Sequence, residues 1–319
     1  MGLPFKQVNF DMKSERQDLK YVINHKSKLN NMLSELNATN SKTLFAEING
    51  RKIAYRSIGK GDPIILCQRF RGNLDDWDPA FLDALSRNYN VITFDYTGVA
   101  SSTGEPPTNM ILFAKDVVDL AEALNLKKII VGGWSFGGFV AQIVTTEFPE
   151  LVSQTVLIGT RAPGSVKYPS EEIFFKLATK PDNGFEDEVI LFFEPTSKVS
   201  TAAAQESHQR IGERSVDNDI KVRLDLLQFY FKGGADFQQD PYNAKQKLTE
   251  TKIPILVVSA DHEICFPPEN WFELNRKLPT TQIVVIPQSG HGVHHQYPDL
   301  VSAHIHSFIE HNKKLGLAN

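Results

Sequence analysis

Apolar residues in the central part of the chain come in short runs that alternate with segments of helical periodicity. Six runs are almost continuously apolar, as is typical of strands buried on both faces. They are residues 63–67, 91–94, 128–132, 155–158, 255–258 and 282–286. Apolar residues recur at helical spacing over residues 78–86, 110–124, 138–147, 269–278 and 300–311. This alternation predicts an α/β fold in which helices flank a mostly parallel central sheet.

Three further segments complete the expected organisation. Two short apolar runs flank the pair Asn49-Gly50, which predicts a β-hairpin at the start of the core. Residues 1–42 are polar with apolar residues three and four apart, which predicts an N-terminal helical extension. Residues 161–248 contain helical, aromatic segments, and we expect them to form a helical cap over the carboxyl ends of the strands. The α/β core would then comprise residues 43–160 and 249–319.

Composition and charge exclude several classes of partner. Of 319 residues, 41% are hydrophobic and 23% are charged, which is enough for a large buried core. The net charge is −4 and the basic residues are scattered, so we expect no nucleic-acid partner. No apolar run approaches the ~18 residues that cross a bilayer, and the first residues do not resemble a secretory signal. We therefore expect a cytoplasmic protein with no membrane partner.

The clearest chemical motif is Gly133-Trp134-Ser135-Phe136-Gly137, which matches the pattern G-x-S-x-G. It lies between a predicted strand and a predicted helix, where a nucleophilic serine can be held on a sharp turn. Glycines beside the serine allow the backbone to close and the hydroxyl to project. Ser135 is therefore the candidate nucleophile.

A serine hydroxyl needs a base, and the base needs a group that orients it. His291 lies in a glycine-flanked loop directly after the predicted strand 282–286, which makes it the candidate base. The loop after strand 255–258 offers two carboxylates, Asp261 and Glu263, and one of them should orient the histidine. No carboxylate or cysteine spacing around His291 suggests a metal site, so we expect neither a metal nor a cofactor.

These motifs, over residues 43 to 309, resemble the α/β-hydrolase fold superfamily, which includes serine esterases with a helical cap and haloperoxidase- or perhydrolase-like enzymes. The family's acid loop has a proline four residues beyond the acid. Pro267 stands four residues beyond Glu263, so the resemblance favours Glu263 over Asp261. Residues 95–102 are similar to the family's D-x-x-G-x-G-x-S turn, with Ala100 in place of one glycine.

One segment departs from the family pattern. Where the family usually has His-Gly after the third strand, residues 68–72 read Gln-Arg-Phe-Arg-Gly. The oxyanion donors of this fold are backbone N–H groups, so the resemblance places them at Phe70 and Phe136. The Arg69 and Arg71 side chains either pair with nearby aspartates among residues 75–78 or face the pocket and bind an anionic substrate group.

A serine nucleophile, a histidine base and two amide donors imply acyl transfer to water. We expect cleavage of a carboxylic ester, lactone or thioester through an acyl-enzyme on Ser135. Arg69, Trp134 and Phe139 are candidate substrate contacts, and the aromatic residues around them suggest a small apolar ester. Two alternatives stay open: a cofactor-free haloperoxidase or perhydrolase, and a non-catalytic protein that binds a small molecule on a hydrolase scaffold.

Overall fold

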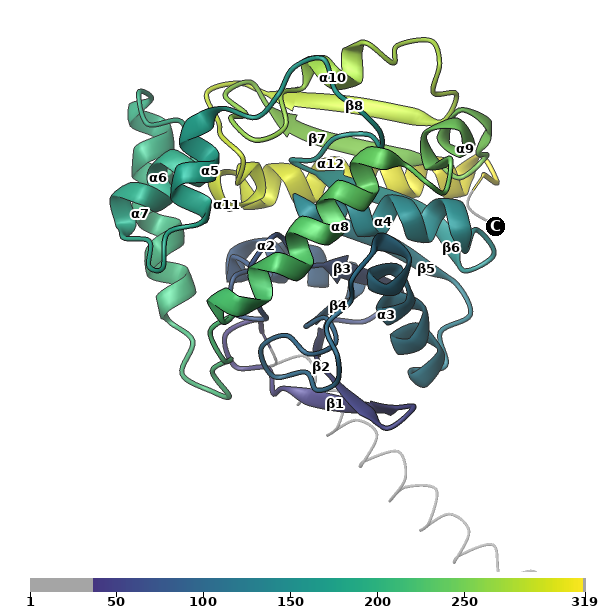
Figure 1. The fold of residues 1–319 in the computed structure, drawn as a ribbon, viewed down its shortest axis with the longest axis horizontal. Helices are drawn as coiled ribbons and strands as arrows, with labels where there is room; N and C mark the ends of the chain where they lie inside the picture. The colour runs from purple at the N-terminus through teal and green to yellow at the C-terminus, as the bar shows by residue number, and fades with distance from the viewer. Residues whose placement is uncertain (1–36, 318–319) are drawn as a thin grey trace, which may run out of the picture. The chain divides into compact units, whose positions relative to one another are not determined.

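The main feature of the computed structural model is an eight-stranded sheet (Figure 1). The structure describes residues 37–317. The strands are β1 (Leu44–Ile48), β2 (Arg51–Ile58), β3 (Asp62–Cys67), β4 (Tyr89–Phe94), β5 (Ile129–Trp134), β6 (Val152–Ile158), β7 (Ile255–Ala260) and β8 (Thr281–Ile286). Their order across the sheet is β1-β2-β4-β3-β5-β6-β7-β8. All six predicted apolar runs lie in strands, and β5, β6 and β7 lie side by side.

Strand direction divides the sheet in two. β1 pairs with β2, and β2 with β4, in antiparallel register, whereas every other neighbouring pair is parallel. The predicted hairpin joins β1 to β2: Asn49 and Gly50 have φ of 48° and 79°, the left-handed values that a tight two-residue turn needs. The predicted mostly parallel sheet is thus confirmed.

Helices cover both faces of the sheet. α3 (Met110–Ala123) and α4 (Phe136–Glu147) pack in one apolar core with Ile65 and Val131. α2 (Pro79–Ser86), α11 (Val293–Gln296) and α12 (Pro298–Lys314) pack on the other face. Polar side chains cap the N-termini of α2 and α3. Asp78 accepts a hydrogen bond from the Ala80 amide, and Asn109 accepts one from the Leu112 amide.

One predicted helix is much shorter than expected. The pattern predicts a helix over residues 269–278, but α10 (Glu269–Phe272) ends after a single turn. Arg276 adopts a left-handed φ of 66°, and Pro279 disfavours helical backbone at residue 278. The apolar residues Trp271 and Leu274 are nevertheless buried in the core. Consecutive turns, rather than a longer helix, place them there.

The segment between β6 and β7 is helical, as predicted. It contains α5 (Glu172–Ala178), α6 (Phe185–Phe192), α7 (Lys198–Gly212), the short 3-10 helix η1 (Leu224–Leu226), α8 (Leu227–Gln239) and α9 (Ala244–Glu250). Figure 1 shows α5, α6 and α7 grouped together and α8 crossing the view diagonally, with its upper end beside α4. We call residues 161–248 the cap segment. Its separation from the core as a domain stays a prediction, because Tyr230 and Phe237 of α8 belong to the core on the α3 and α4 face.

The predicted N-terminal extension lies mostly outside the described residues. Its described part, residues 37–42, forms a turn. Within residues 37–317, no helix is both long and apolar enough to cross a bilayer.

Candidate active site

Ser135 occupies a strained turn between β5 and α4. Its backbone has φ 59° and ψ −119°, a combination that L-residues seldom adopt, and its side chain is almost completely buried. The turn leaves no room for larger neighbours: a Cβ on Gly137 would lie 2.0 Å from the Cys67 carbonyl oxygen, and one on Gly133 would lie 2.1 Å from the Gly137 carbonyl oxygen. The two glycines of the motif are therefore needed for close backbone approach.

Two backbone amides lie next to this turn. Phe136 is the first residue of α4, so its N–H has no partner within the helix and lies at the positive end of the helix dipole. Phe70 follows β3, the strand beside β5. Both residues line a cavity together with Ser135. The structure thus brings together the two residues expected to supply oxyanion donors and the candidate nucleophile.

His291 and Glu263 form a buried hydrogen-bonded pair. The His291 Nδ1 atom lies 2.9 Å and 2.8 Å from the two Glu263 carboxylate oxygens. Because a carboxylate accepts, Nδ1 carries the proton and Nε2 is left as the acceptor. The Cys265 and Phe266 amides donate to Glu263 Oε1 at 2.9 Å and 3.2 Å, which fixes the carboxylate. His291 lines the same cavity as Ser135.

The other carboxylate in this loop has a different place. Asp261 is exposed, and its Oδ1 accepts the Ser289 amide at 3.2 Å. It therefore braces the loop that carries His291 from outside, whereas Glu263 contacts the imidazole. The neighbouring His262 contacts the carboxylate of Glu194 in the cap segment through its Nδ1 atom. Of the two carboxylates, Glu263 is the one that contacts the His291 imidazole, and its role as the orienting acid stays a prediction.

Two residues that the sequence did not assign to this pair lie against it. Gly159 follows β6 with φ 49°, and a Cβ there would lie 3.2 Å from both Glu263 Oε2 and His291 Nδ1. Trp134 donates its indole N–H to the His291 carbonyl at 2.9 Å. Trp134 is buried and lines neither cavity that contains Ser135, so the structure does not place it where a substrate contact was predicted. A glycine directly after a predicted strand was the only sequence signal for Gly159.

Ser135 lies where two cavities of opposite character meet. One, of about 370 Å³, also contains His291 and several charged side chains. Those charged residues are Arg69, Arg71, Asp75, Asp76, Glu188, Asp219 and Lys221. The other, of about 520 Å³, is mostly apolar and is lined by eight aromatic residues, including Phe139 and Phe266. We call them the polar cavity and the apolar cavity. Phe70 and Phe174 line both.

Arg69 and Arg71 are both held by the protein and also line the polar cavity. Arg69 forms an ion pair with Asp76 at 2.8 Å, and its guanidinium lies over the rings of Trp134 and Phe192. Arg71 donates to the carbonyls of Lys180 and Pro181 in the cap segment. The predicted pairing with an aspartate is therefore found for Arg69, whereas Arg71 ties the loop after β3 to the cap segment.

The remaining histidines near the site are structural. His294 and His295 of α11 are buried against Trp134, with ring centroids 4.6 Å and 4.7 Å away. Burial lowers the pKa of His295 to about 4 and lowers the pKa of His294 well below its usual value. Both rings are therefore neutral at physiological pH and act as part of the core under the candidate base.

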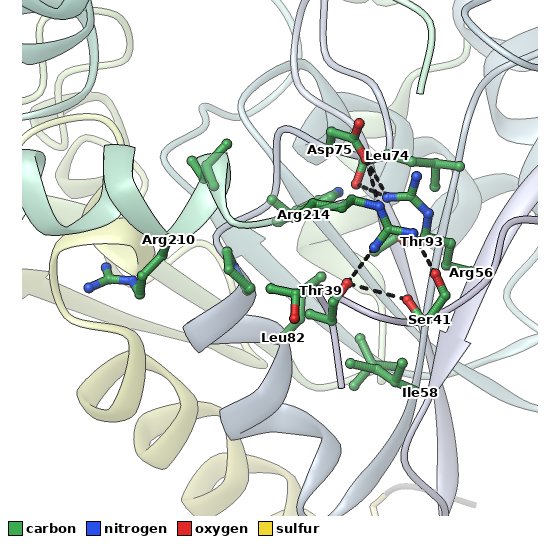
Figure 2. Close-up of a pocket in the computed structure, with 15 residues that line it drawn as sticks. Thr39, Ser41, Arg56, Ile58, Leu74, Asp75, Leu82, Thr93, Arg210 and Arg214 are labelled. Carbon is green, nitrogen blue, oxygen red and sulfur yellow. Dashed lines mark hydrogen bonds and ion pairs between the residues drawn. The ribbon is translucent and has the colours of Figure 1, made fainter. Parts of the chain in front are cut away.

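A third cavity is too small for a substrate. Figure 2 shows it beside Arg56 and Arg214, whose guanidinium groups both contact Asp75 at 2.6 Å and 3.2 Å. Its volume is about 20 Å³, which is room for little more than a water molecule. Arg214 also donates to the carbonyls of Ala38 and Ser41, so this charged cluster attaches residues 38–41 to the cap segment.

Comparison with known proteins agrees with this architecture. A family model described as alpha/beta hydrolase fold matches residues 62–298. A solved structure of an alpha/beta hydrolase fold protein from Chitinophaga pinensis superimposes with a TM-score of 0.76 at 26% sequence identity. That match covers 86% of this chain and 99% of the other.

Two curated relatives are similar over nearly their whole length. Proline iminopeptidase PfmaB from Pestalotiopsis fici is 27% identical over 285 residues, which cover 83% of this chain and 99% of that protein. A putative non-heme bromoperoxidase, BpoC, from Mycobacterium tuberculosis is 27% identical over 269 residues, which cover 81% of this chain and 97% of that protein. The names of these two relatives describe different reactions.

Proposed function

This chain belongs to the alpha/beta hydrolase fold family, and we propose that it is a serine hydrolase that cleaves a carboxylic ester through an acyl-enzyme on Ser135. The observation that carries the proposal is the shared cavity. The serine on the strained turn and the histidine held by Glu263 line one cavity, although they are 156 positions apart along the chain. Nucleophile, orienting acid and base follow one another in the chain order of this fold.

The proposed reaction assigns one role to each group. His291 Nε2 takes the proton of the Ser135 hydroxyl as its oxygen bonds to the carbonyl carbon of the ester. Glu263 orients the imidazole and stabilises its protonated form. The Phe70 and Phe136 amides stabilise the negative charge that forms on the carbonyl oxygen. The alcohol leaves with the proton from His291, and water then attacks the acyl-enzyme by the same route to release the acid.

Labelling with a fluorophosphonate tests this proposal directly, because such probes react with an activated serine hydroxyl. We expect stoichiometric phosphonylation, mapped by peptide mass spectrometry to the peptide that contains Ser135. The Ser135→Ala variant should fold normally, resist the probe and lose p-nitrophenyl ester turnover by at least ~10³-fold. Normal turnover in that variant would exclude the assignment. Labelling without turnover of any ester would instead favour a non-catalytic binding protein.

A second candidate rests on the bromoperoxidase-named relative. With hydrogen peroxide in place of water, the same acyl-enzyme would release a peracid, which oxidises halide without a metal or cofactor. Monochlorodimedone bromination in acetate buffer with peroxide tests this alternative. Ser135-dependent bromination that exceeds ester hydrolysis would favour it, whereas hydrolysis alone would favour the esterase.

A further inference from the structure

The apolar cavity contains one charged residue that the proposed reaction does not use. Arg161 follows β6 and is 7% exposed. Within residues 37–317, every other side chain that lines this cavity is uncharged. A buried guanidinium is costly unless an anion pairs with it, so its presence in an aromatic cavity calls for an explanation.

The protein satisfies this guanidinium only in part. Arg161 Nη1 donates to the Ala162 and Gly164 carbonyls at 3.0 Å and 2.8 Å. The group also lies over the rings of Phe139 and Phe237, at 5.1 Å and 5.4 Å from their centroids. Across the described residues, no carboxylate forms an ion pair with it, and Nε and Nη2 have no hydrogen-bond partner. Carbonyls and aromatic faces orient the cation, but they do not neutralise it.

Other buried arginines of the chain are treated differently. Among the described residues, the buried Arg56 and Arg214 contact Asp75, and the partly buried Arg210 contacts Asp78 at 2.7 Å. Burial lowers the pKa of Arg161 to about 10, which still leaves it protonated at neutral pH. Among the described residues, the lack of a paired carboxylate therefore distinguishes Arg161 from the other buried arginines.

We infer that Arg161 binds a carboxylate of the substrate, so that the enzyme prefers esters in which an apolar chain or ring carries an anionic group at a distance from the scissile bond. The inference rests on the proposed function and specifies its substrate class. Two free N–H donors on a planar guanidinium match the two oxygens of a carboxylate. Phe139, on which Arg161 lies, is one helical turn from Ser135, roughly 6 Å along α4. The aromatic side chains of the apolar cavity can contact the part of the substrate that joins the ester, at Ser135, to the carboxylate, at Arg161.

Paired substrates that differ only in charge test the inference. The first pair is mono-p-nitrophenyl adipate and the nearly isosteric p-nitrophenyl heptanoate, with the anion on the acyl side. The second pair is 4-acetoxybenzoate and its methyl ester, with the anion on the alcohol side. In at least one pair we expect the native protein to favour the anionic ester in kcat/KM. In Arg161→Gln that preference should fall by about 10- to 100-fold, mainly through KM. Arg161→Lys should retain part of it.

Arg71→Gln is the matched comparison, because Arg71 also donates to carbonyls but lines the polar cavity. If the anion preference follows Arg71 instead, the carboxylate binds in the other cavity and the inference is wrong. The inference is equally wrong if Arg161→Gln changes both members of each pair alike, or if the native protein shows no anion preference. Thermal unfolding of each variant separates lost recognition from lost folding.

A binding measurement distinguishes failure of the inference from failure of the proposed function. Titration calorimetry would compare 4-phenylbutyrate with 4-phenylbutanamide on Ser135→Ala and on Ser135→Ala/Arg161→Gln. Charge-selective binding that needs Arg161, without turnover of any ester by the native protein, would retain the anion site and reject the hydrolase. Ester turnover with no charge-selective binding would reject the anion site and retain the hydrolase.

Discussion

The carboxyl edge of the sheet and the cap segment meet at Ser135 but are built on different principles. At the sheet edge, a Cβ added at Gly133, Gly137 or Gly159 would lie 2.9 Å or less from a backbone carbonyl oxygen. In the cap segment, Phe175 and Phe231 line the apolar cavity while remaining about half exposed. Under the proposed function, tight packing at the sheet edge fixes the reacting groups, whereas these two exposed rings of the cap segment contribute contact area for a substrate.

The largest effect on activity is expected at Glu263, the proposed orienting acid. Glu263→Gln should reduce kcat by about 10²- to 10⁴-fold, because the amide cannot stabilise a protonated imidazole as a carboxylate does. Asp261→Asn is the matched control, since Asp261 lies in the same loop and its carboxylate accepts the Ser289 amide, whereas the Glu263 carboxylate contacts His291. We expect it to lose less than ~3-fold. Steady-state kinetics with one ester would measure kcat for both variants. A greater loss of kcat in Asp261→Asn than in Glu263→Gln would exclude Glu263 as the acid.

The dense packing under the site predicts a pH-dependent stability. His294 and His295 are neutral in the fold because burial lowers the pKa of each, whereas in the unfolded chain they protonate below about pH 6.5. The unfolded state therefore binds more protons, and these two groups reduce the free energy of unfolding as pH falls from about 6.5 to about 4.

Urea unfolding at pH 7.5 and pH 5.0 measures this contribution. His294→Phe should reduce the loss of stability between these two pH values by about 1–2 kcal/mol relative to the native protein. Substitution of the exposed His311 by glutamine serves as the control. An equal pH dependence in the native protein and His294→Phe would show that the buried histidine does not destabilise the acidified fold.

A smaller effect on activity is expected from substitutions in the cap segment. Phe175→Ala should raise KM for apolar esters by about 3- to 10-fold and change kcat less, because the ring contributes contact area but no reacting group. Phe272→Ala is matched in exposure, at 51% against 52%, and lines neither cavity that contains Ser135. If kcat fell as much as in Glu263→Gln, the cap segment would share in positioning the reacting groups.

The smallest expected effect concerns backbone strain beside the sheet edge. Ala100 has a left-handed φ of 47°, which costs an L-residue about 1–2 kcal/mol. Ala100→Gly should therefore stabilise the fold by about 0.5 kcal/mol, after the greater flexibility of glycine in the unfolded chain is counted. Ala202→Gly, at an exposed position within α7, should instead destabilise by about 1 kcal/mol. Chemical denaturation of the two variants would show whether the sign reverses as expected.

Local patterns were sufficient for much of the site. The apolar runs predicted the strands, and the positions of Ser135, Glu263 and His291 just beyond three of those strands predicted that they would meet. Their meeting follows from strand order, because parallel neighbours place their carboxyl ends along one edge. The length of the helix at residues 269–278 could not be predicted in the same way. The apolar pattern indicates that Trp271 and Leu274 are buried, and turns can bury them as well as a helix can.

Strand periodicity, glycine and proline act on neighbouring residues, so local patterns were enough to predict the α/β fold, the serine turn and the order of the groups around it. Three features became evident only in the folded chain: Glu263 rather than Asp261 contacts the histidine, Trp134 donates to the His291 carbonyl, and no carboxylate among the described residues pairs with the buried Arg161. These outcomes depend on distances between segments far apart in the chain. Pairing, burial and missing partners are properties of packed surfaces, which no local pattern encodes.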